Sequence, residues 1–387
     1  MKLAVICETT LDRGGGFNQA LNAAVQIERL AGEFIEYFVV RDEQTGEVLS
    51  EHTKAEVKKF KPGLLDGVVK IGQRFDAAGD VSRLTFLSTK LERMLIKDGI
   101  DLVYFLAPSS TPLLLRNLNY VLTVWDICHR DSPEFPEVRN NGESKWRDYS
   151  LQNTLSKAVL TLVDSTELRD RLQAQFGVSA DRLLPMPFSA APHLQNTRPL
   201  PRPEDGYLYY PAQFWAHKNH VRILEALKIL AEDGLRPNVV FSGGDKGCLD
   251  HIKALSSRFG LDQQVKIAGF VQPEEMVGLF EGAAAVLMPS YFGPTNLPPL
   301  EAWKMRRPLI CSTVMSKQVG DAAITFDPDR ADDLAQAIRD VLQKNIADQL
   351  VERGSTRLEE LEAQRMQAET DFVAKLESYG AKRRCWP

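Results

Sequence analysis

The sequence has few cysteines, no long apolar run and no excess of basic residues, and each absence excludes a class of protein. Five cysteines lie scattered over 387 residues without a C-x-x-C pair, which argues against a disulfide framework or zinc knuckle and favours a reducing compartment. No stretch approaches the roughly 18 uninterrupted apolar residues of a membrane span. The first apolar run, Leu3 to Cys7, is too short for a signal peptide. We therefore expect a cytoplasmic protein.

The charge balance excludes a nonspecific nucleic-acid binder. Lys and Arg number 47 against 52 Asp and Glu, a formal net charge of −5, whereas displacement of counterions from nucleic acid needs a basic surplus. Hydrophobic residues make up 44% and charged residues 26%, which are ordinary values for a globular protein. A chain of this length predicts two domains.

Short apolar runs alternate with helical periodicity along the first half of the chain. Strands are predicted at residues 2–8, 33–40, 102–106, 121–124 and 159–163. A proline-rich stretch, Pro185–Gly206, reads as an interdomain linker because prolines at this density cannot propagate a helix or fill a central strand. The first domain is expected over 1–190.

A second α/β series follows the linker, with strands predicted at 207–210, 238–242, 265–268, 284–288, 308–311 and 322–326. The second domain is expected over 207–354. A charged helix over 355–379, within a C-terminal segment 355–387, is predicted to pack back on the first domain. The predicted fold class is α/β, with two Rossmann-like doubly wound domains facing a cleft, where such sheets bind their ligands.

The segment Pro289–Arg307 carries the strongest motif. A strand ends there in a loop that leads to Leu297-Pro-Pro-Leu-Glu301, and prolines suit the first turn of a helix. Thr295 and Asn296 are candidate caps that would leave amides exposed to bind phosphate. Glu301, expected in the first turn, could accept hydrogen bonds from a ribose. A proline-rich loop with a glutamate serving only the helix dipole explains the spacing equally well.

Other strand ends supply further candidates. Lys218 follows the strand at 207–210 and precedes Asn219, a potential helix cap; by itself it also reads as a solvated lysine. Gly243 and Gly244 follow another strand and would admit a ligand or simply form a tight turn. Asp126 and His129 follow a first-domain strand, and a loop histidine of this kind is as often structural as functional.

The residues 297–302, L-P-P-L-E-A, resemble the C-terminal signature of retaining glycosyltransferases of family 4, which have the two-domain GT-B fold. Glu301 matches the second glutamate of the family's E-x7-E pattern, whereas Gly293 stands at the first. Lys218 matches the lysine of the G-R-x4-K motif that neutralises the nucleotide diphosphate, and Gln213 occupies its arginine position. The loop F-G-P-T-N resembles a subgroup that includes bacterial O-antigen and polysaccharide glycosyltransferases.

The resemblance implies a set of site residues. It assigns catalytic or cleft roles to Lys218, Glu301, His129 and Asp126. It assigns donor binding to Gly15, Gly16, Gln213, Lys218, Gly243, Gly244, Phe270, Val271, Gly293, Thr295, Asn296, Leu297 and Glu301.

The resemblance implies a metal-independent glycosyltransferase that moves a hexose, with mannose favoured, from a nucleotide diphosphate sugar to a saccharide acceptor. A GDP-sugar is the expected co-substrate and no other cofactor is expected. Asp327-Pro328-Asp329 imitates a metal-binding D-x-D motif, but turn chemistry accounts for it. A sugar-nucleotide epimerase or hydrolase, and a noncatalytic sugar-nucleotide-binding subunit, stay open as alternatives.

Basic and apolar residues mix over residues 54–74. Such a segment suits peripheral contact with an anionic membrane at its inner face and a lipid-linked saccharide acceptor. A solvated amphipathic element over the first domain's core is the other interpretation. Its basic members are Lys54, Lys58, Lys59, Lys61, Lys70 and Arg74.

Overall fold

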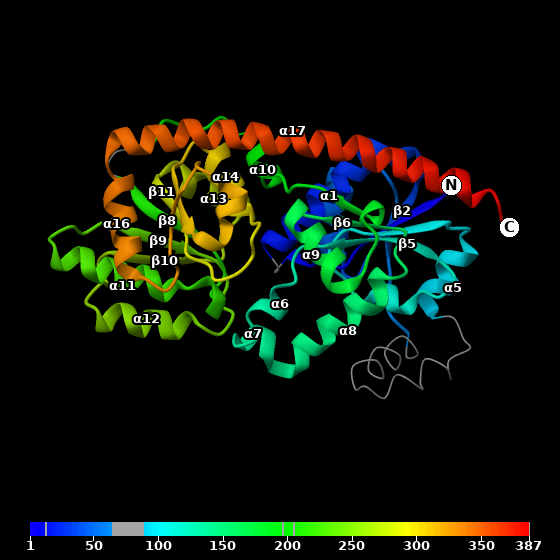
Figure 1. The fold of residues 1–387 in the computed structure, drawn as a ribbon, viewed down its shortest axis with the longest axis horizontal. Helices are drawn as coiled ribbons and strands as arrows, with labels where there is room; N and C mark the ends of the chain where they lie inside the picture. Colours follow the sequence, from blue (N-terminus) through cyan, green and yellow to red (C-terminus); the bar gives the residue numbers. More distant parts are fainter. Residues whose placement is uncertain (12–13, 64–88, 196, 204–205, 387) are drawn as a thin grey trace. The chain divides into compact units, whose positions relative to one another are not determined.

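The computed structural model describes residues 1–11, 14–63, 89–195, 197–203 and 206–386. The chain divides into two compact units (Figure 1). Unit 1 comprises Met1–Ile127, Gly142–Pro187 and Gln364–Pro387, and unit 2 comprises Cys128–Asn141 and Phe188–Ala363. Residues 128–141, 188–190 and 355–363, which were expected with the first domain, group with unit 2.

The sheet of unit 1 has the strand order of a Rossmann fold. Among the described residues it contains seven parallel strands in the order β3-β2-β1-β4-β5-β6-β7. The strands are β1 (Leu3–Cys7), β2 (Ile35–Val40), β3 (Val57–Lys59), β4 (Leu102–Phe105), β5 (Asn119–Val124), β6 (Leu160–Val163) and β7 (Leu183–Pro185). Chain order reverses between β1 and β4, and the carboxyl ends of strands at such a reversal are where these folds bind ligands.

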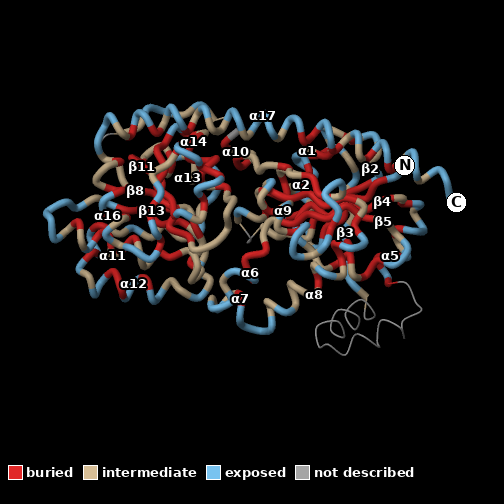
Figure 2. The backbone as a smooth tube through the Cα atoms, in the orientation of Figure 1, coloured by how far each residue is buried: buried red, intermediate tan, exposed pale blue. Residues whose placement is uncertain are grey.

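Strand β1 shows why the apolar runs are continuous rather than alternating. Leu3, Val5 and Cys7 belong to the core on one face of the sheet, and Ala4 and Ile6 to the core on the other. Both faces of a parallel sheet are covered by helices, so every position is buried. In Figure 2 the central strands, such as β4 and β5 in unit 1 and β8 (Tyr207–Pro211) and β11 (Ala283–Met288) in unit 2, are mostly red, and the outward helix faces are blue.

The helices of unit 1 begin at side-chain caps where the sequence supplies them. Asp42, Thr89 and Ser165 each accept a hydrogen bond from the backbone amide three residues on, which satisfies a donor that a helix start leaves unpaired. The longer helices are α1 (Gly15–Ala31), α2 (Glu43–His52), α5 (Lys90–Lys97), α8 (Glu143–Leu155) and α9 (Thr166–Phe176).

Unit 2 repeats the same topology. Its sheet, in the described part of the chain, has six parallel strands in the order β10-β9-β8-β11-β12-β13, so chain order reverses between β8 and β11. The strands are β8 (Tyr207–Pro211), β9 (Val239–Ser242), β10 (Val265–Gly269), β11 (Ala283–Met288), β12 (Leu309–Ser312) and β13 (Ile324–Phe326).

Helices cover both faces of this second sheet. Helix α11 packs on α12 and α16, while α10 packs on α13 and α14. They are α10 (Pro192–Gln195), α11 (His220–Glu232), α12 (Leu249–Arg258), α13 (Pro273–Glu281), α14 (Leu297–Lys304), α15 (Ser316–Val319) and α16 (Ala331–Val341). Two short helices, α6 (Cys128–Asp131) and α7 (Pro136–Arg139), also belong to unit 2.

The structure confirms the predicted pair of doubly wound α/β folds and corrects some of its elements. Strands β3 and β7 were not predicted, and β7 ends at Pro185, which had been placed in the linker. Helix α17 runs from Lys344 to Arg383 instead of 355–379. Within unit 1 its Phe372 ring lies 5.7 Å from Tyr104, centroid to centroid. No helix of the described chain has the length and apolar character needed to cross a membrane.

Candidate functional site

The two loops with the strongest motifs leave the sheet of unit 2 at its topological reversal. Strands β8 and β11 are neighbours, with Tyr209 paired to Val286. The loop after β8 leads to Lys218, and the loop after β11 leads to Glu301. Neighbouring parallel strands end at the same edge, so this fold brings both loops to the place where a ligand is expected.

Lys218 ends a single 3₁₀ turn, η6 (Ala216–Lys218), and its backbone is fixed by neighbouring groups. The Tyr210 hydroxyl donates to the Lys218 carbonyl oxygen at 2.8 Å. Gln213 accepts a hydrogen bond from the Trp215 indole at 3.0 Å. The Lys218 side chain therefore projects from a loop whose backbone is fixed by a hydrogen bond, and the sequence predicts this loop position. Gln213 contributes no charge.

Asn219 does not cap α11, contrary to expectation. It adopts a left-handed conformation (φ 55°) and makes no side-chain cap hydrogen bond. Its side-chain amide donates instead to the carbonyl oxygens of Pro289 (3.2 Å) and Pro328 (3.1 Å). Asparagine tolerates this backbone region better than most residues, so it can turn the chain and join two loops at once.

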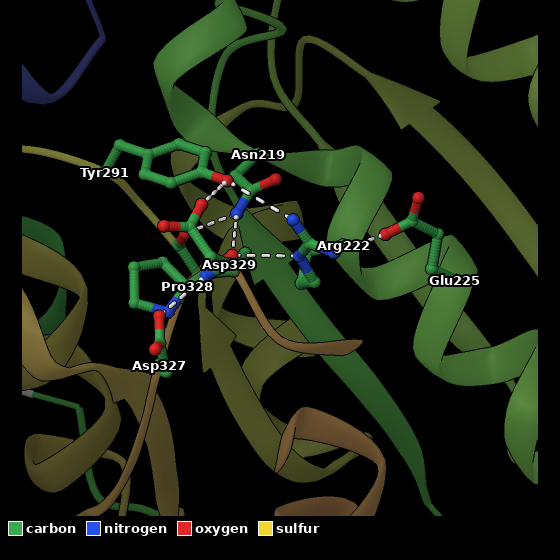
Figure 3. Close-up of polar contacts among 8 residues, drawn as sticks. Asn219, Arg222, Glu225, Tyr291, Asp327, Pro328 and Asp329 are labelled. Atoms are coloured by element: carbon green, nitrogen blue, oxygen red, sulfur yellow. Dashed lines mark hydrogen bonds and ion pairs between the residues drawn. The ribbon is translucent and has the colours of Figure 1, made fainter. Parts of the chain in front are cut away.

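Arg222 extends this junction (Figure 3). Its Nε donates to the Pro328 carbonyl oxygen at 2.8 Å, and its Nη1 lies 2.7 Å from the Glu225 carboxylate. Its Nη2 is 3.4 Å from the Tyr291 hydroxyl, which donates to Asp329 at 2.8 Å. No local pattern in the sequence indicates this network, which joins the loops after β8, β11 and β13 to one another.

The start of α14 offers fewer free amides than predicted. The Asn296 amide donates to the Gln318 side chain at 2.9 Å, and the Asn296 side chain donates to the Gly293 carbonyl without capping the helix. Pro298 and Pro299 carry no N–H. Phosphate binding at this end is therefore left to the Leu297 amide and to Thr295, whose buried hydroxyl has no partner among the described residues.

Glu301 is the buried carboxylate of the site. It is 4% exposed and lies one turn into α14, because the helix begins at Leu297 rather than Pro299. Burial raises the pKa of Glu301 to about 7. Within the described residues no hydrogen bond or ion pair to this carboxylate is recorded. A buried acid without partners is costly, so a hydroxyl-bearing ligand is its natural complement.

The two glycines after β9 differ in their surroundings. A Cβ at Gly243 (φ 148°) would lie 2.3 Å from the Ala212 carbonyl oxygen, so glycine is required there by the adjoining loop rather than by a ligand. A Cβ at Gly244 would meet nothing within 4 Å, which leaves space beside the backbone. Phe270 follows β10 and is 58% exposed, with Val271 next to it.

Glu137 is a site neighbour that the sequence analysis missed. Its carboxylate accepts from the His217 backbone amide at 3.0 Å and pairs with the His217 ring. Burial alone would raise the pKa of Glu137, but the His217 hydrogen bonds hold it below its usual value. A contact across eighty residues leaves no local pattern in the sequence.

The candidates in the N-terminal half fall into different parts of the structure. Gly15 and Gly16 open α1, behind Gly14 at φ 56°. Asp126 is ion-paired with Arg147 at 2.6 Å in unit 1. His129 is 1% exposed and belongs to unit 2.

Asp164, predicted to be a structural junction, is 3% exposed. Its pKa is raised to about 8, mainly by burial and also by the negative charge of Asp126, despite a hydrogen bond from Ser165. It is therefore largely protonated at neutral pH.

The segment Asp327-Pro328-Asp329, which imitates a metal-binding motif, is bonded within its own turn, and the nearby His220 is buried. Asp327 accepts a hydrogen bond from the Asp329 amide at 2.9 Å, which is turn chemistry. His220 is 2% exposed against Phe214, and burial lowers its pKa to about 3. No group of three or more His, Cys, Asp or Glu side chains in the described part of the chain is placed to hold a metal ion.

Part of the basic and apolar segment 54–74 lies outside the described residues, from position 64 onward. Lys58 and Lys59 form strand β3, where Lys58 pairs with Asp98 at 3.3 Å and Lys59 with Glu43 at 3.2 Å. Their charges are thus partly offset by carboxylates of the same unit.

Comparison with known proteins identifies the class. Crystal structures of sucrose-phosphate synthase from Thermosynechococcus elongatus and of Anabaena Alr3699/HepE in complex with UDP-glucose both align at a TM-score of 0.71. They are 16% and 14% identical to this chain, covering 98% and 97% of it and 100% of each neighbour. With two Rossmann-ordered sheets, the chain has the two-domain GT-B fold.

Residues 195–357 form a domain that matches the family described as Glycosyl transferases group 1. The O-antigen chain mannosyltransferase B of Escherichia coli is 27% identical over 220 residues, covering 54% of this chain and 58% of that protein. The matched region thus spans less than two thirds of the length of this curated relative. The matched domain contains Lys218 and Glu301.

Proposed function

We propose that this chain is a retaining, metal-independent glycosyltransferase that moves a sugar from a nucleotide diphosphate sugar to a saccharide acceptor in cell-surface polysaccharide synthesis. The observation that carries the proposal is the buried carboxylate of Glu301, inside the matched domain and at the topological reversal of the sheet. Its proposed partner is the ribose diol of the nucleotide.

The geometry of unit 2 supports different roles for Lys218 and Glu301. Lys218, on the turn after β8, would neutralise the negative charge that develops on the departing diphosphate. A donor fixed before the reaction stabilises developing charge without reorganisation. Glu301 would hold the ribose, away from the breaking bond. Thr295 and the Leu297 amide are the proposed additional phosphate contacts.

Mannose as the transferred sugar and GDP as the nucleotide belong to the same proposal. They rest on the likeness to the O-antigen mannosyltransferase and on the resemblance of the F-G-P-T-N loop. A lipid-linked saccharide is the proposed acceptor. Retention at the anomeric carbon also rests on that resemblance, and proton NMR of the product would test it.

A specific observation favours a second candidate, a sugar-nucleotide-binding subunit without transfer activity. Gly293 stands where the resembled loop has a glutamate, and it holds a φ of 91°. A Cβ there would meet the Asn296 side chain at 2.9 Å. A glutamate at this position, which the resemblance associates with the transferred sugar, would therefore be strained by its φ and would displace the Asn296 side chain.

A thermal-shift panel with GDP, UDP, dTDP and CMP, with and without Mg²⁺, tests the proposal first. A bound nucleotide raises the melting temperature according to its concentration over its dissociation constant. Stabilisation by one diphosphate without Mg²⁺ is the expected result, and no stabilisation by any would refute nucleotide binding. Transfer to a saccharide primer then separates an enzyme from a binding subunit, and nucleotide release without acceptor would favour a hydrolase or epimerase.

A further inference from the structure

The turn that presents Lys218 is held by a residue eighty positions upstream. His217 precedes Lys218, and its backbone N–H donates to the Glu137 Oε1 at 3.0 Å. The His217 ring nitrogen Nδ1 pairs with the same oxygen. Glu137 lies on α7, in the segment Cys128–Asn141 that belongs to unit 2.

Aromatic rings enclose this pair. The His217 ring stacks on Phe292 with centroids 3.9 Å apart and planes at 17°. Phe135, two residues before Glu137, lies 6.4 Å from the His217 ring and 5.3 Å from Phe292. The side chains of Glu137 and His217 are each only 12% exposed. A charge-assisted hydrogen bond is stronger where water is excluded.

The peptide groups on both sides of Lys218 are fixed as well. The Tyr291 amide donates to the His217 carbonyl oxygen at 2.9 Å, and the Tyr210 hydroxyl donates to the Lys218 carbonyl oxygen at 2.8 Å. With these carbonyl oxygens held, a further constraint on the turn is at His217, where Glu137 accepts hydrogen bonds from both the backbone amide and the ring. Removing the carboxylate would remove the hydrogen bonds that it accepts from the His217 amide and ring together.

We infer that Glu137 is a positioning residue for the diphosphate-binding cation: through His217 it fixes the backbone from which Lys218 reaches the nucleotide diphosphate. This inference rests on the proposed function of Lys218. Glu137 touches neither substrate nor reacting atoms, so its effect should appear in the part of the ligand that Lys218 contacts.

Isothermal titration with a nucleoside diphosphate and its nucleoside isolates that effect. The pair used is GDP with guanosine or UDP with uridine, whichever diphosphate the wild-type chain binds more tightly. The ratio of the nucleoside Kd to the diphosphate Kd measures the contribution of the phosphates. A charge-assisted phosphate contact corresponds to roughly 10- to 100-fold in this ratio, so K218A should lower it by that factor.

For E137A we expect the ratio to fall about tenfold while the nucleoside Kd stays unchanged. The reason is that a displaced Lys218 ammonium group lies farther from the diphosphate and loses part of its electrostatic attraction to it. E137Q keeps an acceptor oxygen for the His217 N–H groups and should stay within about threefold of wild type. E134A is the matched control, since Glu134 is exposed and three residues away. It should leave the ratio unchanged.

The double variant K218A/E137A should bind like K218A alone, because residues acting through one contact are not additive. Equal weakening of nucleoside and diphosphate by E137A, or additive losses in the double variant, would show a merely structural role and overturn the inference. If E137A fails to fold, E137D replaces it, since its shortened carboxylate cannot reach both N–H groups. A wild-type chain that binds neither diphosphate would overturn the proposed function and this inference with it.

Discussion

Replacing Glu301 by glutamine keeps the size of the side chain and removes its ionisable proton. Glu301 is 4% exposed, and burial raises the pKa of its carboxyl group from 4.5 to about 7. Between these two pH values the folded protein keeps a proton that the unfolded chain releases. Stability therefore falls as the pH rises through this window, and the loss is complete above the folded pKa.

The size of this effect follows from the shift in pKa. Each unit corresponds to about 1.4 kcal/mol, so the wild-type chain should lose about 3 kcal/mol of stability between pH 4.5 and pH 8 relative to E301Q. Urea unfolding of both proteins at the two pH values measures the difference. The variant is expected to be the more stable of the two at pH 8.

Nucleotide affinity should show the opposite pH dependence, with wild type binding more tightly as the pH rises. Ribose hydroxyls donate to the ionised carboxylate, so binding lowers the pKa of Glu301 and releases a proton. With a free pKa of about 7, wild-type affinity should improve about tenfold from pH 6 to pH 8. The terminal phosphate of a nucleoside diphosphate also titrates near pH 6. The wild-type change must therefore be measured against that of E301Q, by calorimetry at each pH.

An identical pH dependence in wild type and E301Q would refute this reasoning. If wild type and E301Q show the same pH dependence of both stability and nucleotide affinity, Glu301 is not the buried acid that meets the ribose. If stability differs as expected but affinity does not, the carboxyl is buried as described and its assignment to the ribose is wrong. In the transfer reaction, E301Q should raise the donor KM more than it lowers kcat.

Four further results are expected. Lys218→Ala should lower turnover by about 10²–10³ with circular dichroism unchanged, and near-normal turnover would remove this lysine from the mechanism. Gly243→Ala should lower the melting temperature well below that of Gly244→Ala, because its Cβ would lie 2.3 Å from a backbone carbonyl oxygen; equal values would contradict the described loop. Asp164→Asn should gain stability over wild type as the pH rises from 4 to 8, because the wild-type pKa is raised to about 8; urea unfolding across that range checks the sign. Flotation with anionic liposomes at low and high salt tests the membrane contact expected of segment 54–74, and a protein that stays soluble at low salt would argue against it.

The sheets were predictable because most of their central strands are continuous apolar runs buried on both faces. Strand β11 is all apolar over Ala283–Met288 and was found within one residue. Strands β3 and β7 were missed because each has only three residues, and Val57–Lys59 carries two lysines. A run of three residues shows no periodicity. Pairing with the adjacent strand, β2 for β3 and β6 for β7, determines its extended conformation.

The positions of Lys218 and Glu301 were also predictable, because each follows the end of a central strand in the chain. Their surroundings were not. The Asn219 side chain donates to carbonyl oxygens of two other loops, and the Asn296 side chain donates to the Gly293 carbonyl oxygen of its own loop, and neither caps the next helix. Local sequence indicates that an asparagine side-chain oxygen can accept a cap hydrogen bond, but the folded arrangement decides whether the side chain is oriented to do so. The contact between Glu137 and His217 was beyond sequence reasoning for the same cause.

The left-handed glycine at position 293 constrains any attempt to convert this chain to the motif it resembles. Gly293→Glu would add a Cβ at 2.9 Å from the Asn296 side chain and force an unfavourable φ of 91°. Exchanging that single residue would strain the loop before the new carboxylate could meet a sugar. Gaining the carboxylate therefore requires the backbone at position 293 to leave its left-handed conformation and the Asn296 side chain to move, so the two loop types differ in backbone conformation as well as in one side chain.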